Sequence, residues 1–196
     1  MMPFRLGLTG SIGMGKSTTA RIFAAEGVPV WSADSAVHRL YAPGGQAVAP
    51  IAAIFPALIR DGSVSRETIR EHLVRDPSIL PRIESIVHPL VTADRAGFIR
   101  AETAPLIVLD IPLLFESATE ADLDATLLVT APPKLQRARV LARPGMTEVH
   151  FQRILVRQMP DAEKRKRASH IVETLDLPTV TAYVRALIRQ IRDENA

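Results

Sequence analysis

Eight consecutive residues near the start of the chain have the types and spacing that hold a nucleotide's phosphates. The segment Gly10–Ser17 reads GSIGMGKS and matches the pattern G-x-x-x-x-G-K-[ST] at every fixed position. In such a loop glycines turn backbone N–H groups inward, a lysine reaches the β- and γ-phosphates, and a serine hydroxyl ligates Mg²⁺. The alternative is a glycine-rich turn that only starts a helix. We expect the phosphates to contact Gly13, Met14, Gly15, Lys16, Ser17 and Thr18, with Ser17 as a Mg²⁺ ligand.

This phosphate loop (Gly10–Ser17) occurs in kinases, GTPases and ATPase motors, so other features must choose among them. The chain has no Asn-Lys-x-Asp motif, which weighs against a GTPase. Residues 134–167 contain ten basic and three acidic side chains, whereas the net charge of the whole chain is only +3. A short chain with such a cluster favours a small-molecule kinase, in which a mobile lid closes over ATP and excludes water. The small net charge does not indicate a nucleic-acid-binding protein.

Alternating strand-like and helix-like segments surround the phosphate loop and must position it. Apolar runs predict strands at Phe4–Leu8 and Val28–Trp31, and the run LIVLDIPLLF after Pro105 is typical of a strand buried on both faces. We also expect a helix at 16–26, mostly helical structure over 35–100, a strand at 126–130, helices at 133–142 and 147–159, a short strand at 170–172 and a final helix at 178–192. Strands that alternate with helices predict an α/β fold with a parallel sheet.

The composition predicts a single globular domain without membrane or secretion signals. The chain has 196 residues, of which 47% are hydrophobic and 23% charged, and it shows no repeat or linker. No apolar run has the roughly 18–20 residues that span a bilayer, and the N-terminal run is too short for a signal peptide. Because cysteine is absent, disulfides and thiolate metal sites are excluded. We therefore expect a cytoplasmic protein that contacts no membrane.

Several motifs, taken together and in order, resemble the dephospho-CoA kinase family along nearly the whole chain. TGSIGMGKST is similar to the phosphate loop of that family, and VWSADSAVHRLY is similar to its segment at the end of the second strand. IVHPLV and DIPLLFE resemble its next two signatures, and Gln136, Arg139 and Arg143 fit its lid pattern Gln-x-x-Arg-x-x-x-Arg. Arg153 and Gln158 fit the helix that follows. Each short motif alone is weak evidence for the family, whereas the order and spacing of all of them together are specific to it.

The resemblance implies a fold, a division of the chain and a reaction. The fold would be a three-layer α/β/α arrangement with a parallel sheet, a helical acceptor-binding insertion and a small lid. A single kinase domain would span residues 1–196, with the core at 1–34, 105–135 and 165–196, the insertion at about 35–104 and the lid at about 136–160. The reaction would use ATP and Mg²⁺ to phosphorylate the ribose 3′-hydroxyl of dephospho-CoA, giving CoA and ADP. We expect a monomer that binds these two small molecules and no nucleic acid.

The resemblance also assigns roles to individual residues, most of which have a structural alternative. Asp34 would orient or deprotonate the accepting hydroxyl, or it would cap the helix that starts at Ser35. Arg139 and Arg143 would act with Lys16 on the transferred phosphoryl group, or the two arginines would lie on a solvated helix face. Asp110 would hold Mg²⁺ directly or through water, or it would cap the end of its strand. The acceptor would contact Asp34, His88, Pro89, Leu113, Leu114, Phe115 and Glu116, of which Leu113–Phe115 would otherwise be core residues and His88 a structural histidine.

Several other basic residues are expected to have no role in the site, and the sequence departs from the family pattern at two positions. Lys134, Arg137 and the run 164–167 are expected on a solvated helix face, which is the usual meaning of a charge run. Ser32 replaces an acid that the family often has, so Asp34 would carry more of the acceptor chemistry. Thr174 stands near where the family has an Asn beside the adenine, so backbone groups would contact the adenine there instead. The alternatives are another nucleoside or nucleotide kinase, and a nucleotide-binding regulatory module without transfer activity.

Overall fold

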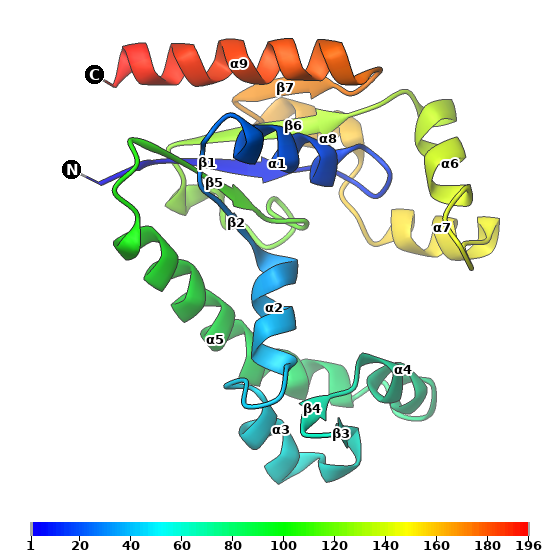
Figure 1. Cartoon of the computed structure of the whole chain (residues 1–196). Coiled ribbons are helices and arrows are strands. Elements are labelled where there is room, and N and C mark those ends of the chain that lie inside the picture. Colours follow the sequence, from blue (N-terminus) through cyan, green and yellow to red (C-terminus); the bar gives the residue numbers. More distant parts are fainter. Residues whose placement is uncertain (1, 196) are drawn as a thin grey trace. The chain divides into compact units, whose positions relative to one another are not determined.

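The computed structural model describes residues 2–195, so the first and last residues of the expected domain, 1 and 196, lie outside the description (Figure 1). The chain divides into two compact units. The sheet unit combines the chain up to Trp31 with the chain from Glu102 onward, and the helical unit is Ser32–Ala101. Across the described residues, no helix is long and apolar enough to cross a bilayer.

A five-stranded sheet in the order β2-β5-β1-β6-β7 forms the centre of the sheet unit. β1 is parallel to β5 and β6, and β6 is parallel to β7. Because β1 is the central strand, the phosphate loop leaves the sheet at its middle. The elements are β1 (Phe4–Thr9), α1 (Lys16–Ala25), β2 (Val30–Ser32), β5 (Leu106–Asp110), β6 (Ala125–Thr130), α6 (Pro133–Leu141), α7 (Glu148–Val156), α8 (Asp161–Arg167), β7 (His170–Glu173) and α9 (Leu177–Glu194).

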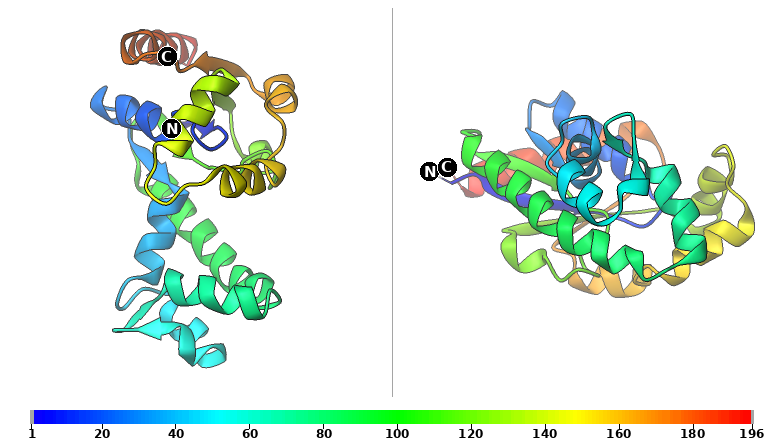
Figure 2. Two further views of the ribbon diagram at one scale, coloured as in Figure 1. Left: turned by 90° about the vertical axis from the view of Figure 1, so that its right-hand side faces the viewer. Right: turned by 90° about the horizontal axis from the view of Figure 1, so that it is seen from below.

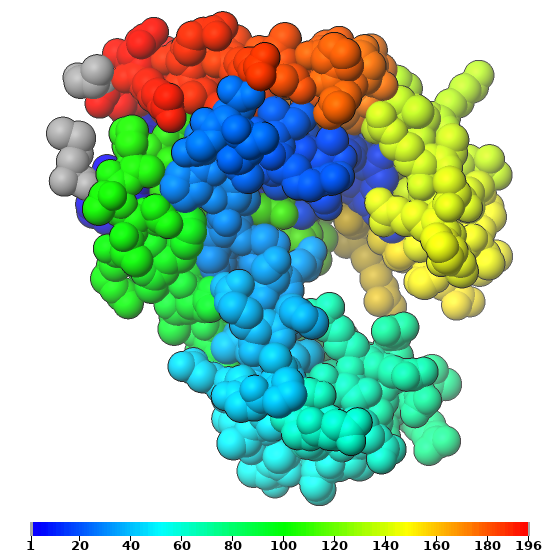
Figure 3. Space-filling model, viewed as in Figure 1, coloured from blue at the N-terminus to red at the C-terminus, as the bar shows by residue number. Residues whose placement is uncertain are grey.

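Helices α1 and α9 cover one face of this sheet. Successive strand residues point to opposite faces, and Leu6, Leu8 and Val129 share a buried cluster with Phe23 of α1 and Leu187 of α9. The apolar side chains of α9 recur at helical spacing, so the helix buries one side and leaves the other at the surface (Figure 3). This cluster is the core of the sheet unit.

The loop after β5 and helix α8 cover the opposite face. A Cβ on Gly7 would lie 2.3 Å from Leu123 Cδ1 and 2.8 Å from Leu114 Cδ1, so only glycine allows this close packing. Thr130, next to Val129 and therefore on the other face, donates from Oγ1 to Asp161 of α8 at 3.1 Å. Figure 2 shows α8 and α9 on opposite sides of the sheet in its left-hand view. The three layers confirm the expected α/β fold.

The helical unit has its own core and a small hairpin. Its buried cluster includes Leu40, Ile51 and Ile83. β3 and β4 pair across Asp61-Gly62, both with positive φ, as a two-residue hairpin turn of type I′ requires. The sequence predicts a break at this dipeptide but not the strands beside it. The elements are α2 (Ala33–Tyr41), α3 (Val48–Ile54), β3 (Ile59–Arg60), β4 (Ser63–Val64), α4 (Arg66–Arg75) and α5 (Ile79–Ala101).

Two expected elements of the sheet unit have different ends. The expected strand through LIVLDIPLLF ends at Asp110, because Pro112 has no N–H to continue a ladder and the chain turns there. The expected helix at 147–159 ends at Val156, and a separate helix, α8, follows Pro160. The first correction places the apolar residues 111–115 in a connecting segment, and the second does the same for Gln158.

Candidate active site

The phosphate loop has the backbone conformation that its glycines predict. Gly13 and Gly15 have φ values of 77° and 93°, in the left-handed region that favours glycine. Helix α1 begins at Lys16 without a side-chain cap, and such a helix start attracts anions through its N–H groups and dipole. The side chain of Met14 is buried, and its sulfur accepts from Ala131 N at 3.0 Å. Met14 therefore offers a ligand only its backbone.

Lys16 meets Asp110 at the end of the sheet. Nζ of Lys16 lies 2.6 Å from Oδ1 of Asp110, and only 12% and 8% of the two side chains are exposed. The register of β1 and β5 pairs Leu8 with Asp110, so the strand end brings the carboxylate to the phosphate loop. The two residues were expected at one nucleotide site, and the structure brings them together as an ion pair.

The donors at this point fit a magnesium ion that is shared with a nucleotide. Mg²⁺ prefers oxygen ligands and is commonly held by one or two protein groups together with substrate phosphates. The Ser17 hydroxyl, next to Lys16 in the chain, and the Asp110 carboxylate are such groups. No cluster of three or more His, Cys, Asp or Glu suited to a metal occurs among residues 2–195. The chain's own ligands therefore fit Mg²⁺ only together with the phosphates.

Arg139 is fixed against the phosphate loop through Thr174. Its Nη1 donates to Thr174 Oγ1 at 2.8 Å and its Nη2 to Thr174 O at 2.6 Å. Thr174 Oγ1 in turn lies 2.8 Å from Met14 O, inside the loop. The threonine that replaces the expected asparagine thus joins α6 to the loop, a role that its residue type alone does not predict. Arg143 lies beyond α6 with its side chain exposed.

The candidate acceptor residues after β5 separate into exposed and buried ones. Leu114 and Phe115 are 0% and 2% exposed, and the Arg167 guanidinium lies over the Phe115 ring, 5.2 Å from its centre. These two side chains are core in this structure and present no surface to a ligand. Leu113 is 46% exposed, so its side chain can contact a ligand.

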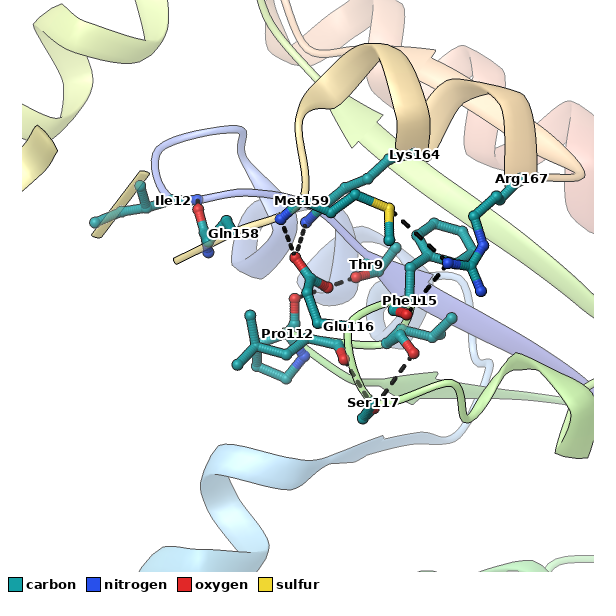
Figure 4. Close-up of polar contacts among 12 residues, drawn as sticks. Thr9, Ile12, Pro112, Phe115, Glu116, Ser117, Gln158, Met159, Lys164 and Arg167 are labelled. Atoms are coloured by element: carbon teal, nitrogen blue, oxygen red, sulfur yellow. Dashed lines mark hydrogen bonds and ion pairs between the residues drawn. The ribbon is translucent and has the colours of Figure 1, made fainter. Parts of the chain in front are cut away.

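Glu116 accepts two contacts on one oxygen (Figure 4). Oε1 receives the Met159 N–H at 2.8 Å and lies 2.9 Å from Nζ of Lys164, whose side chain is fully buried. Burial alone would raise the pKa of Glu116, but the bonds from Lys164 and Met159 N–H outweigh it and leave this pKa below its ordinary value. Lys164 is therefore not on a solvated face, which corrects that expectation: α8 turns it inward to an acid.

We expect the change Glu116→Gln to lower the free energy of unfolding at pH 7 by about 1–3 kcal/mol, as for hydrogen bonds to a charged group. Because the folded-state pKa is depressed, this stability is present above the unfolded pKa and is lost as the pH falls through the folded value. The difference from wild type should therefore shrink below about pH 4. Urea unfolding at pH 7 and at acid pH measures it. Glu163→Gln, at an exposed pair with Lys166, is the control; a Glu116 difference that stays constant with pH would contradict the assignment.

The other three residues of the basic run 164–167 are also paired with acids. Arg165 lies 2.7 Å from Asp161, Lys166 lies 2.8 Å from Glu163, and Arg167 pairs with Glu120. Arg137 of α6 pairs with Glu148 at 2.8 Å, and 57% and 42% of the two side chains are exposed. Five of the ten basic residues at 134–167 are thus paired with acidic side chains.

Three candidate acceptor residues belong to the helical unit. Asp34 is exposed in the first turn of α2, and the residue that caps this helix is Ser32, whose Oγ accepts from Ser35 N at 3.4 Å. Capping therefore does not explain Asp34. His88 and Pro89 are exposed within α5.

Comparison with known proteins identifies the family. The dephospho-CoA kinase family profile (CoaE) matches residues 4–176. A dephospho-CoA kinase from Cereibacter sphaeroides is 63% identical over 193 residues, covering 98% of this chain and 98% of the relative. This chain belongs to the dephospho-CoA kinase family.

Solved structures place the family's fold over the whole chain. A crystal structure of a Thermus thermophilus protein has a TM-score of 0.85 and 32% identity, and covers 97% of this chain and 98% of that one. A dephospho-CoA kinase from Campylobacter jejuni has a TM-score of 0.69 at 20% identity, with coverage of 97% and 98%. The second likeness supports the kinase fold alone, whereas the sequence match carries the family assignment.

Proposed function

We propose that this chain transfers the γ-phosphoryl group of ATP to the ribose 3′-hydroxyl of dephospho-CoA, giving CoA and ADP in the last step of coenzyme A synthesis. The new bond joins phosphorus to the ribose oxygen, the bond to the ADP oxygen breaks, and the hydroxyl proton leaves to a base. The observation that carries the proposal is the 63% identity to a dephospho-CoA kinase over 98% of both chains.

On the donor side, the phosphate loop holds the phosphates of ATP. Gly13, Gly15 and the start of α1 supply backbone N–H groups, and Thr18 adds a hydroxyl. Lys16 neutralises charge that develops on the transferred group, which is the main way proteins accelerate phosphoryl transfer. Ser17 and Asp110 would hold Mg²⁺, which when bound would neutralise charge on the phosphates.

On the acceptor side, Asp34 orients the ribose hydroxyl and takes its proton. It is exposed and another residue caps its helix, so its carboxylate is available to a ligand. We assign the acceptor to the helical region at about 35–104, with contacts from His88 and Pro89. Leu113 adds an exposed apolar contact, whereas Glu116 acts on the acceptor only through the segment that it holds.

We assign the lid to residues 136–160, which carry Arg139 and Arg143. Arg139 is already held at the loop by Thr174, whereas Arg143 is exposed beside the Pro144-Gly145 turn and is free to approach the phosphoryl group when the lid closes. The exposed side chains of α7 within this segment include Val149 and Val156.

We also propose a cytoplasmic monomer that binds no nucleic acid. The pairing of Arg165, Lys166 and Arg167 with acids supports the last point, because phosphate backbones require unpaired basic groups.

The test is ADP formation by the purified chain with Mg²⁺ and each of three acceptors: dephospho-CoA, adenosine and AMP. We expect turnover with dephospho-CoA and little with the others, and mass spectrometry should find the added phosphate on the 3′-oxygen. Equal or faster turnover with adenosine or AMP would overturn the acceptor. ATP binding without transfer to any acceptor would instead indicate a nucleotide-binding module.

A further inference from the structure

Two glutamine side chains bind both backbone polar groups of one residue in the phosphate loop. Nε2 of Gln136 donates to Ile12 O at 2.8 Å, and Oε1 of Gln158 accepts from Ile12 N at 3.1 Å. Figure 4 shows Gln158 against Ile12. A backbone N–H can only donate a hydrogen bond, and a backbone carbonyl can only accept one. Each glutamine amide therefore has only one orientation in which it can bond to Ile12. The Ile12 N–H is therefore held by Gln158 rather than presented to a phosphate.

The Gln136 contact is built into the packing of α6. Gln136 is 7% exposed, and a Cβ on Gly13 would lie 2.5 Å from Val140 Cγ2 and 3.0 Å from Gln136 O. Helix α6 thus rests directly on the turn of the loop that follows Ile12. The Gln136 amide adds to this packing a hydrogen bond to the Ile12 carbonyl, which has no backbone partner within a helix or strand.

The Gln158 contact depends on a different anchor. Gln158 follows α7, and the N–H of the next residue, Met159, is held by Glu116, which also pairs with the buried Lys164 (Figure 4). These contacts fix the backbone beside Gln158 and so fix where its side chain starts. The loop is therefore held from two separate places, α6 and the segment after α7.

We propose that Gln136 and Gln158 are positioning residues that keep the phosphate loop in its ATP-binding conformation and couple it to the segment 136–160. They lie near the two ends of that segment, so its placement and the shape of the loop depend on each other. This inference rests on the proposed function, because it assumes that ATP binds at the loop. Losing either amide should weaken ATP binding and leave dephospho-CoA binding unchanged.

The donor and acceptor directions allow a sharp test. Gln158→Glu keeps an oxygen that accepts from Ile12 N–H, whereas Gln158→Met removes it at similar length. At the other end, Gln136→Glu opposes a carboxylate to the Ile12 carbonyl, and Gln136→Met removes the donor without adding charge. Gln152→Met, on the exposed side of α7, is the matched control.

We expect Gln158→Met to raise KM and Kd for ATP about tenfold, the effect of roughly one hydrogen bond, and Gln158→Glu to bring both within about threefold of wild type. Both Gln136 variants should raise them at least as much as Gln158→Met. KM for dephospho-CoA should not move, and melting temperatures without nucleotide show whether each variant folds. If a Gln136 variant fails to fold, the comparison of Gln158→Met with Gln158→Glu is sufficient to test the proposal.

Two results would overturn the inference: equal ATP affinities for Gln158→Met and Gln158→Glu, or variants that change only the melting temperature. Lys16→Ala, measured in parallel, separates this failure from failure of the proposed function. If Lys16→Ala loses activity while Gln158→Met matches wild type, only the positioning role fails. If Lys16→Ala also matches wild type, the loop is not the nucleotide site.

Discussion

The change Lys16→Ala is expected to lower kcat with ATP and dephospho-CoA by at least about 10²–10³-fold, the typical cost of removing one preorganised electrostatic donor. The lysine lies at the start of α1 with 12% of its side chain exposed, where little water is available to replace its charge. Steady-state kinetics at saturating concentrations of both substrates measure the loss.

Lys166→Ala is the matched control for this prediction. Lys166 is 70% exposed and pairs with Glu163 at the surface of α8, where an ion pair contributes little. Its kcat should stay within twofold of wild type, as a rough limit for a surface change. A rate for Lys16→Ala near that of Lys166→Ala would show that the phosphate loop does not act on the transferred group.

The change Asp34→Asn is expected to lower kcat about 10²–10⁴-fold, the usual contribution of a positioned acid or base, with the Kd for ATP unchanged. The amide keeps the size of the side chain but cannot take the proton of the accepting hydroxyl. Because Asp34 lies in the first turn of α2, losing its charge also removes a favourable dipole contact of about 0.3–1 kcal/mol. That stability change is too small to explain a hundredfold loss of rate.

Glu67→Gln controls for the position of Asp34 in its helix. Glu67 is likewise the second residue of a helix whose N-cap is a serine, Ser65 in α4. Isothermal titration with ATP, thermal unfolding and kcat should be compared for the two variants. If Asp34→Asn and Glu67→Gln have similar kcat values, Asp34 contributes only to its helix and the proton goes elsewhere.

The parts of the site that were predicted from sequence are contiguous or end a strand. The phosphate loop is a run of eight residues with glycines at the two positions, 13 and 15, where its backbone takes positive φ, so the sequence pattern indicates this conformation. Asp110 ends an apolar strand, and strand ends of a parallel sheet meet at one edge. The ion pair between Lys16 and Asp110 additionally required the register of β1 and β5, which no pattern in either strand specifies.

The parts that were missed depend on which neighbour a side chain meets. Lys164 belongs to a run of charges that is typical of a solvated helix face. In the short helix α8, however, Lys164 occupies the position that points inward, so its side chain is buried. Its partner Glu116 comes from a distant loop, so no local spacing indicates the pair. Gln136 and Gln158 matched a family pattern, but only the three-dimensional structure places both amides on Ile12.

The contact between Lys16 and Asp110 has a consequence for the thermodynamics of nucleotide binding. Before ATP arrives, the ammonium group already has an oxyanion 2.6 Å away and has shed most of its hydration. When it turns to a phosphate it exchanges one anionic oxygen for another, so part of the new attraction is offset by the contact given up. The lysine therefore contributes less to ground-state affinity than its charge suggests, and its larger effect falls on the barrier, where phosphate charge is redistributed.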